Sequence, residues 1–156
     1  MNFQNNVSSE GTSIYGFNAK ILLRLISMDS NWSSRGGCIE INNSDLQVSN
    51  STFTNNKGLQ GGVIFAIQRS FFNVLNSTLS NNMAEDGGIV YGMGNQLSTA
   101  DYKNTDNLSL KSTLVEKNWS KQNLIHILLS TMLINDCKIV DNYAQFVTHG
   151  ITLISS

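Results

Sequence analysis

The chain has 156 residues, a formal net charge of -1 at pH 7 and only 13% charged residues. This length predicts one domain at most, and the balanced charge argues against nucleic acid and anionic membranes as partners, because both attract basic proteins. Because so few residues are charged, uncharged side chains must supply the polar surface, and the chain contains 21 Asn and 20 Ser. It contains no Pro. The longest apolar stretches, 21–28 and 124–134, are too short to cross a bilayer, so no transmembrane segment is predicted.

The sequence repeats itself about every 25 residues, which is typical of solenoid folds. Gly-Gly pairs begin at Gly36, Gly61 and Gly87. Five residues before each pair stands an Asn, and this column reads Asn6, Asn31, Asn56, Asn82, Asn118 and Asn142. The spacings within the column are 25, 25, 26, 36 and 24 residues. The long spacing contains a polar insertion at about 94–106, which predicts a surface loop.

Apolar residues keep the same register as the Asn column. They form three columns: Ile21, Leu46, Phe72, Leu108 and Met132; Leu23, Val48, Val74, Leu110 and Ile134; and Met28, Phe53, Leu79, Val115 and Ile139. Within a repeat the apolar positions alternate, as they do in strands, and Gly-Gly, Asn-Ser and Asn-Asn pairs suit sharp corners. We therefore predict an all-β fold over residues 1–156: a single-stranded parallel β-helix of about 5–6 coils with about three short strands per coil.

The Asn column has a physical reason in such a fold. A buried amide at a corner can bond to the equivalent amide one coil away and form a ladder, whereas an unpaired buried amide would cost a few kcal/mol. We predict one ladder through the six Asn residues of the column. A shorter ladder is predicted to pair Asn50 with Asn76.

Two of the repeats resemble a known motif pair. Residues 53–56 (FTNN) followed by 61–64 (GGVI), and 79–82 (LSNN) followed by 87–90 (GGIV), are similar to the FxxN and GGA(I/L/V) motifs of polymorphic outer-membrane-protein repeats. These repeats belong to the wider pectin-lyase-like class of right-handed parallel β-helices. The resemblance implies right-handed coils and a surface-exposed adhesin or a large extracellular protein.

Strand alternation also predicts a candidate contact face. If Ile39, Ile41, Ile64 and Ala66 point inward, two coils present only apolar residues outward: Val63, Phe65, Ile67, Ile89, Tyr91 and Met93. An exposed apolar patch of this size is unusual. Three explanations stay open: the 94–106 insertion covers the patch as a lid, the patch contacts another chain or copy, or the inward and outward assignment is wrong.

The chemistry-bearing residues form no recognisable catalytic set. Asp and Glu residues are scattered, and Asp86 is interpreted as a turn residue. His126 and His149 are almost one repeat apart and could stack, but we expect no Cys or carboxylate beside them. We therefore predict no catalytic residues, no cofactor and no metal. Cys38 and Cys137 lie about three coils apart, too far for a disulfide, and are expected to be free thiols.

The N-glycosylation motifs and the two Trp residues indicate less about function than the repeat does. Among the N-x-S/T motifs, Asn42 and Asn107 lie outside both predicted ladders and are the best candidates for N-glycosylation. Trp32 and Trp119 each follow a ladder Asn, which favours corner packing over sugar stacking.

These patterns favour a non-enzymatic structural or adhesive module, extracellular or on the cell surface, with protein partners or copies of itself and with carbohydrate as a further partner class. It would act through its lateral face and by end-to-end stacking. No signal peptide is visible and neither end shows a cap, so we expect a segment of a longer solenoid. The alternatives are a segment of a carbohydrate-active β-helix enzyme, of the polysaccharide lyase or hydrolase kind, and an intracellular scaffold subunit of a large complex.

Overall fold

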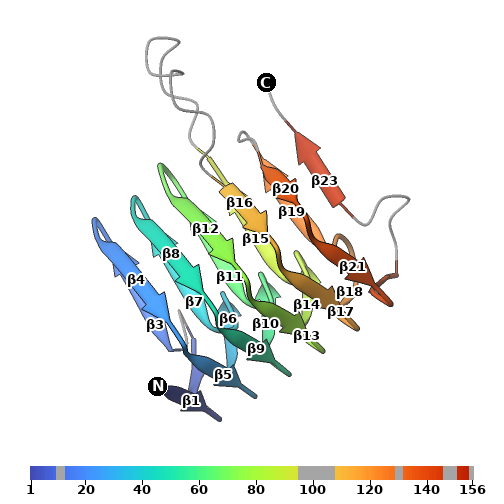
Figure 1. Cartoon of the computed structure of the whole chain (residues 1–156), viewed down its shortest axis with the longest axis horizontal. Coiled ribbons are helices and arrows are strands. Elements are labelled where there is room, and N and C mark those ends of the chain that lie inside the picture. Colours follow the sequence, from blue (N-terminus) through green and yellow to red (C-terminus); the bar gives the residue numbers. More distant parts are fainter. Residues whose placement is uncertain (10–12, 95–107, 129–131, 146–150, 155–156) are drawn as a thin grey trace.

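The chain folds into short parallel strands stacked in coils (Figure 1). The structure is a computed structural model that describes residues 1–9, 13–94, 108–128, 132–145 and 151–154. Within these residues the fold is all-β, a β-solenoid of about five turns, which confirms the predicted fold class. No helix in the described part of the chain is long and apolar enough to cross a membrane.

The strands form four sheets that run along the solenoid. Sheet A contains β1 (Asn2–Gln4), β5 (Ser27–Asp29), β9 (Thr52–Thr54), β13 (Thr78–Ser80), β17 (Leu114–Glu116) and β21 (Lys138–Val140). Sheet B contains β2 (Val7–Ser8), β6 (Trp32–Arg35), β10 (Lys57–Gln60), β14 (Met83–Asp86), β18 (Trp119–Ser120) and β22 (Tyr143–Ala144). Sheet C contains β3 (Ile14–Phe17), β7 (Ile39–Asn42), β11 (Ile64–Ile67), β15 (Val90–Met93), β19 (Ile125–Leu128) and β23 (Ile151–Ile154). Sheet D contains β4 (Lys20–Arg24), β8 (Asp45–Ser49), β12 (Phe71–Leu75), β16 (Leu108–Lys111) and β20 (Leu133–Asn135).

A complete coil therefore has four strands, and the predicted three per coil is wrong. The extra corner separates the strands of sheet C from those of sheet D. In the second coil it turns on Asn43, whose φ of 49° is left-handed. One left-handed residue redirects the chain, so the stretch from 39 to 49 forms β7 and β8 as two strands.

Each kind of corner uses one residue with positive φ. Asn and Gly tolerate this region best, and they occupy many of these positions. At the corner from sheet A to sheet B the residue is Asn55 in the third coil and Asn81 in the fourth, with φ of 57° and 55°. At the corner from sheet B to sheet C it is the first Gly of each pair, for example Gly61 with φ of 69°. The residue after the A-to-B corner is the ladder Asn.

The six ladder Asn residues lie in one column and connect successive coils. From Asn6 to Asn118, each Nδ2 donates to Oδ1 of the next Asn at 2.8 to 3.0 Å. Each Oδ1 also accepts the backbone N–H of the Asn before it, as in the 3.0 Å bond from Asn56 to Asn82. Asn56 and Asn82 are fully buried. The ladder therefore satisfies polar groups that water cannot reach.

The second predicted ladder is wrong in its residues. Asn50 and Asn76 are exposed and have φ of 50° and 47°, so they are the left-handed residues of the corner from sheet D to sheet A. The buried ladder uses the next residue instead. The backbone N–H of Ser51 donates to Oγ of Ser77 at 3.2 Å, and Oγ of Ser51 donates to the Ser49 carbonyl at 2.8 Å.

The core fills the tube between the sheets. The strand register pairs the members of all three predicted apolar columns, two in sheet D and one in sheet A, except Met132, which precedes β20. Sheet C adds an inward column that includes Ile39, Ile64 and Val90. Because identical positions stack on one another, each coil buries its apolar residues against those of its neighbours.

Candidate functional site

The predicted contact face is not an exposed patch. Val63 and Ile89 are 0% exposed and belong to the core, Phe65 and Tyr91 are 4% and 8% exposed, and only Met93 is well exposed, with Ile67 intermediate. The error has a local cause at the corner from sheet B to sheet C. The N–H groups of Val63 and Ile64 both donate to the Ile89 carbonyl, at 3.0 Å each. Residue 63 therefore lies outside the alternation of the strand and turns inward.

Phe65 and Tyr91 are covered although they pack outside the main core cluster. Their rings stack with centroids 5.4 Å apart, and Tyr91 meets the ring of His126 edge-on at 5.0 Å. The guanidinium of Arg35 lies 5.9 Å from the centre of the Phe65 ring, and its Nε lies 3.9 Å from Oε1 of buried Glu40. These contacts form a column along the outer side of sheet C that links four coils.

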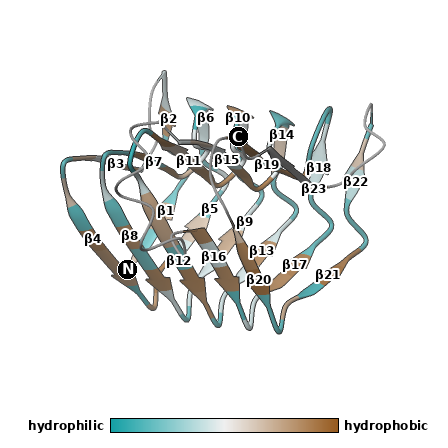
Figure 2. Cartoon of the chain, turned by 90° about the horizontal axis from the view of Figure 1, so that it is seen from above, coloured by the Kyte–Doolittle hydropathy of each residue, from teal (hydrophilic) through white to brown (hydrophobic). Residues whose placement is uncertain are grey.

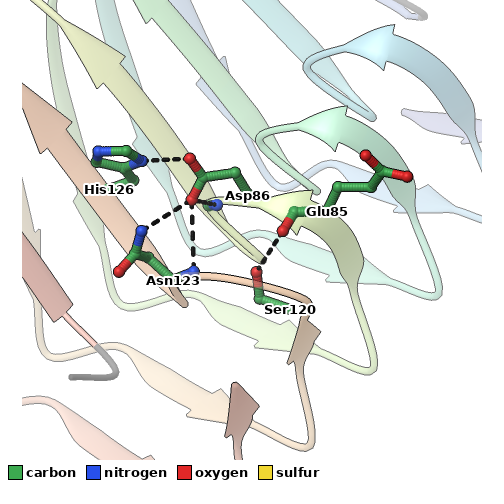
Figure 3. Close-up of polar contacts among 6 residues, drawn as sticks. Glu85, Asp86, Ser120, Asn123 and His126 are labelled. Atoms are coloured by element: carbon green, nitrogen blue, oxygen red, sulfur yellow. Dashed lines mark hydrogen bonds and ion pairs between the residues drawn. The ribbon is translucent and has the colours of Figure 1, made fainter. Parts of the chain in front are cut away.

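Asp86 joins two coils at the end of this column (Figure 3). Its Oδ2 contacts Nδ1 of His126, so the expectation that no carboxylate lies beside His126 is wrong. Its Oδ1 accepts the backbone N–H of Gly87 at 2.9 Å and Nδ2 of Asn123 at 3.0 Å. The prediction of a turn residue is wrong, because Asp86 is the last residue of β14; its side chain connects β14 to the coil that contains β19.

The cluster of Asp86, His126 and Tyr91 offers few groups for proton transfer or metal binding. An Asp–His pair can move a proton in a catalytic site, but both carboxylate oxygens of Asp86 are already bound within the chain. Burial, and secondarily the charge of Asp86, raises the pKa of Tyr91, so its phenol stays protonated at neutral pH. In the described part of the chain no group of three or more His, Cys, Asp or Glu side chains is placed to hold a metal ion. His149 lies outside the described residues.

A groove of about 550 Å³ lies beside Asp86. It is lined by Ser9, Ser34, Arg35, Leu59, Gln60, Glu85, Asp86 and Gln122. The lining comes from successive coils at sheet B and mixes polar, charged and apolar side chains. The groove therefore borders the outer face of sheet B.

That outer face carries an exposed column that sequence reasoning missed. The sheet-B stripe, as we call it, consists of Val7, Trp32, Lys57, Met83, Trp119 and Tyr143, which the strand register places in one line. The strands of sheet B stand in a row along one side of the solenoid (Figure 2). Four apolar side chains of the stripe are exposed, Val7 by 75%, Trp32 by 42%, Met83 by 39% and Tyr143 by 56%, and Lys57 is exposed as well. Trp32 is therefore not simply packed into a corner, whereas Trp119 is partly buried. Their position directly after a ladder Asn was the available signal.

The predicted glycosylation residues lie in different settings. Asn42 ends β7, and its side-chain Oδ1 is buried with no hydrogen-bond partner among the described residues. Asn107, like the insertion from residue 95 onward, lies outside the described residues. Whether the insertion covers Phe65 and Tyr91 therefore stays a prediction, as does glycosylation at either Asn.

The two cysteines are free, as predicted. Burial raises the pKa of the Cys38 thiol well above its usual value, and its side chain is fully enclosed in the core. Cys137 is partly exposed. Because the thiolate is the reactive form, we expect iodoacetamide to label Cys137 in the native protein and Cys38 only after unfolding, as read by peptide mass spectrometry. The Cys137→Ser variant should show no fast labelling, and equal labelling rates for the two thiols in the native protein would contradict the burial of Cys38.

The geometry shows a β-solenoid with a closely packed apolar interior and an exposed stripe along sheet B. The polymorphic outer-membrane-protein resemblance, the pectin-lyase-like class and the handedness stay predictions. Comparison with protein-family models, with curated proteins and with solved structures finds no match for this chain.

Proposed function

We propose that the chain is a non-enzymatic structural or adhesive module of a cell-surface or extracellular assembly. The stacked coils would supply a stiff body, and the sheet-B stripe would supply the lateral contact face. One observation carries this proposal: large apolar side chains of four coils, including Trp32 and Tyr143, are exposed in a single line. Contiguous exposed apolar surface marks interaction sites in soluble proteins, and aromatic residues and Met are enriched at protein interfaces.

The Asp86–His126 pair supports the non-enzymatic part of the proposal. Oδ1 of Asp86 accepts bonds from Gly87 and Asn123, and Oδ2 contacts His126. A carboxylate that acts as a general acid or base must reach the substrate's proton. Here the carboxylate holds a turn and the next coil together, which is a structural task.

The contact face can be tested by site-specific photo-crosslinking in intact cells that produce the protein. We expect a photo-crosslinking amino acid in place of Met83, in the sheet-B stripe, to form covalent adducts with another protein chain. The matched control is Gln47, an exposed residue of β8 in sheet D. Adducts at 47 as abundant as those at 83, or none at 83, would contradict the proposed face. Added protease that cleaves the chain without breaking the cells would support surface exposure.

A further inference from the structure

We propose that Asn50 and Asn76 carry N-linked glycans. Each residue begins an Asn-Ser-Thr motif, which is an acceptor for N-glycosylation in secreted proteins. The proposal rests on the proposed function, because only a chain that enters the secretory route meets an oligosaccharyltransferase. The sequence favours Asn42 and Asn107 instead, since it places Asn50 and Asn76 in a buried ladder, but the structure exposes both of these residues.

The reaction sets two requirements on the acceptor. Nδ2 of the Asn displaces the diphosphate from C1 of a lipid-linked oligosaccharide: the Nδ2–C1 bond forms, the C1–O bond breaks, the lipid diphosphate leaves with the electron pair, and one amide proton passes to a base. Nδ2 keeps only one of its two donor hydrogens, and a bulky sugar chain extends from it. An acceptor must therefore lie at the surface of the folded protein, and the fold must not depend on both of its amide hydrogens.

The acceptor motifs of the Asn ladder fail these requirements. Nδ2 of Asn31 donates both of its hydrogens, to the Phe3 carbonyl at 3.2 Å and to Oδ1 of Asn56 at 2.9 Å. Nδ2 of Asn118 also donates two bonds, both at 2.9 Å. Asn31 and Asn118 are each only 1% exposed. A sugar on either residue would remove a buried hydrogen bond and would have no path to solvent.

Asn50 and Asn76 meet both requirements. They are exposed at the corner from sheet D to sheet A. Their backbone N–H groups hold the corner by donating to the carbonyls of Leu75 and Lys111, at 3.1 and 3.0 Å. Their side-chain amides make no hydrogen bond with the described part of the chain. A sugar on Nδ2 therefore costs neither residue a hydrogen bond to these parts of the fold.

The fold alone does not account for the two motifs. The left-handed residue at this corner is Leu25 in one coil and Ser112 in another, so Asn suits the corner without being required there. The strand register aligns Thr52 and Thr78 with Leu114 at the first position of their strands, so the strand does not require Thr either. Both residues of the acceptor motif nevertheless occur together in two adjacent coils, which favours a role in glycosylation.

The proposed glycans lie away from the sheet-B stripe. Around each coil, sheet A separates the corner between sheets D and A from sheet B (Figure 2). Sugar chains at this corner extend from the other side of the solenoid and leave Trp32 and Met83 open. The module can therefore be glycosylated on one side and make its lateral contact on the other.

The experiment maps glycan sites on the protein purified from the cells that produce it. Peptide N-glycosidase in heavy-oxygen water converts each glycosylated Asn to an Asp that carries the heavy oxygen, and peptide mass spectrometry locates it. We expect the label at Asn50 and Asn76, and none at Asn31 or Asn118. Absence of the label at either proposed site would overturn the assignment of that residue. Label at the ladder residues would contradict the argument from burial.

Two variants test the motifs separately. Thr52→Ala removes the first motif and Thr78→Ala the second, and neither changes the acceptor amide. We expect each variant to lose one glycan, seen as one step in gel mobility, and to keep the other. The matched control is Ser8→Ala, which removes the motif of Asn6 in the ladder and should leave the glycans unchanged. Circular dichroism verifies that all variants remain folded.

The outcomes separate this proposal from the proposed function. If added protease cleaves the chain on intact cells and crosslinking at Met83 captures another chain, but no glycan is found, the surface module stands and the glycan sites fail. If glycans are found at Asn50 and Asn76 but no adduct forms at Met83, the glycan sites stand and the lateral contact face fails.

Discussion

Replacing Gly62 with alanine is expected to lower the free energy of unfolding by more than about 4 kcal/mol, or to prevent folding altogether. A Cβ at this position would lie well within 3.0 Å of the Gly88 carbonyl oxygen in the next coil. The Met83 carbonyl oxygen would also be closer than 3.0 Å. All these neighbours are backbone atoms of hydrogen-bonded coils, so none can rotate away. The two coils would have to separate where Gly62 N–H now donates to the Gly87 carbonyl at 3.0 Å.

Gly16→Ala is the matched control. A Cβ there would also meet an atom inside 3.0 Å, but this atom is Cδ1 of Ile21, the end of a flexible side chain. We expect a loss of about 1 kcal/mol or less, because Ile21 can change rotamer. Urea unfolding followed by circular dichroism compares the two variants. Equal stability of the two variants would show that the coils do not approach as closely at Gly62 as the structure has them.

The Gly-Gly pairs show how far one repeat can be interpreted in isolation. A pair of glycines predicts a tight turn, and the first glycine of each pair does have positive φ, as at Gly61. The second glycine is required for a different reason. At Gly62 the constraint comes from the backbone of the next coil, which no pattern within a single repeat describes. Recurrence of the pair across coils was the only sequence signal for it.

The columns of the core were predictable because stacking repeats places equivalent residues in register. The number of strands per coil was not. At the corner between sheets C and D, Asn43 is followed at once by Ser44, whereas in the next coil Gln68 has the positive φ and Ser70 follows two residues later. In the third coil the corner residue is therefore Gln rather than Asn or Gly, and one extra residue stands between it and the Ser. The repeat pattern did not reveal this corner for that reason. The predicted number of strands per coil was therefore one too low.

The contacts of the candidate site join residues that are far apart in the sequence. Asp86 and His126 are 40 residues apart and meet because they occupy neighbouring coils. The assignment of Val63 as outward failed because two N–H groups share one carbonyl just before β11. For Trp32, exposure depends on which side of sheet B faces solvent, which strand alternation alone does not determine.

Replacing Asn82 with alanine is expected to lower the free energy of unfolding by about 3–5 kcal/mol, because several buried partners lose their hydrogen bonds at about 1–3 kcal/mol each. Nδ2 of Asn82 donates to Oδ1 of Asn118 and to the Phe53 carbonyl, both at 3.0 Å. Oδ1 of Asn82 accepts both the N–H and Nδ2 of Asn56. Alanine removes all four bonds at a fully buried position in the middle of the ladder. Urea unfolding of the variant and the unmodified protein measures the loss.

Asn81→Gly is the matched control for the ladder, since it changes the neighbouring Asn and leaves the amide column intact. Asn81 is exposed and has φ of 55°, a conformation that glycine adopts without strain. We expect its stability to stay within about 0.5 kcal/mol of the unmodified protein. Asn6→Ala at the first ladder position should fall between the two, because Asn6 is only partly buried and its side chain donates to Asn31 without accepting from an earlier ladder Asn. If all three variants lost the same free energy, the ladder would contribute no more than an ordinary corner, and the selective placement of Asn in this column would need another cause.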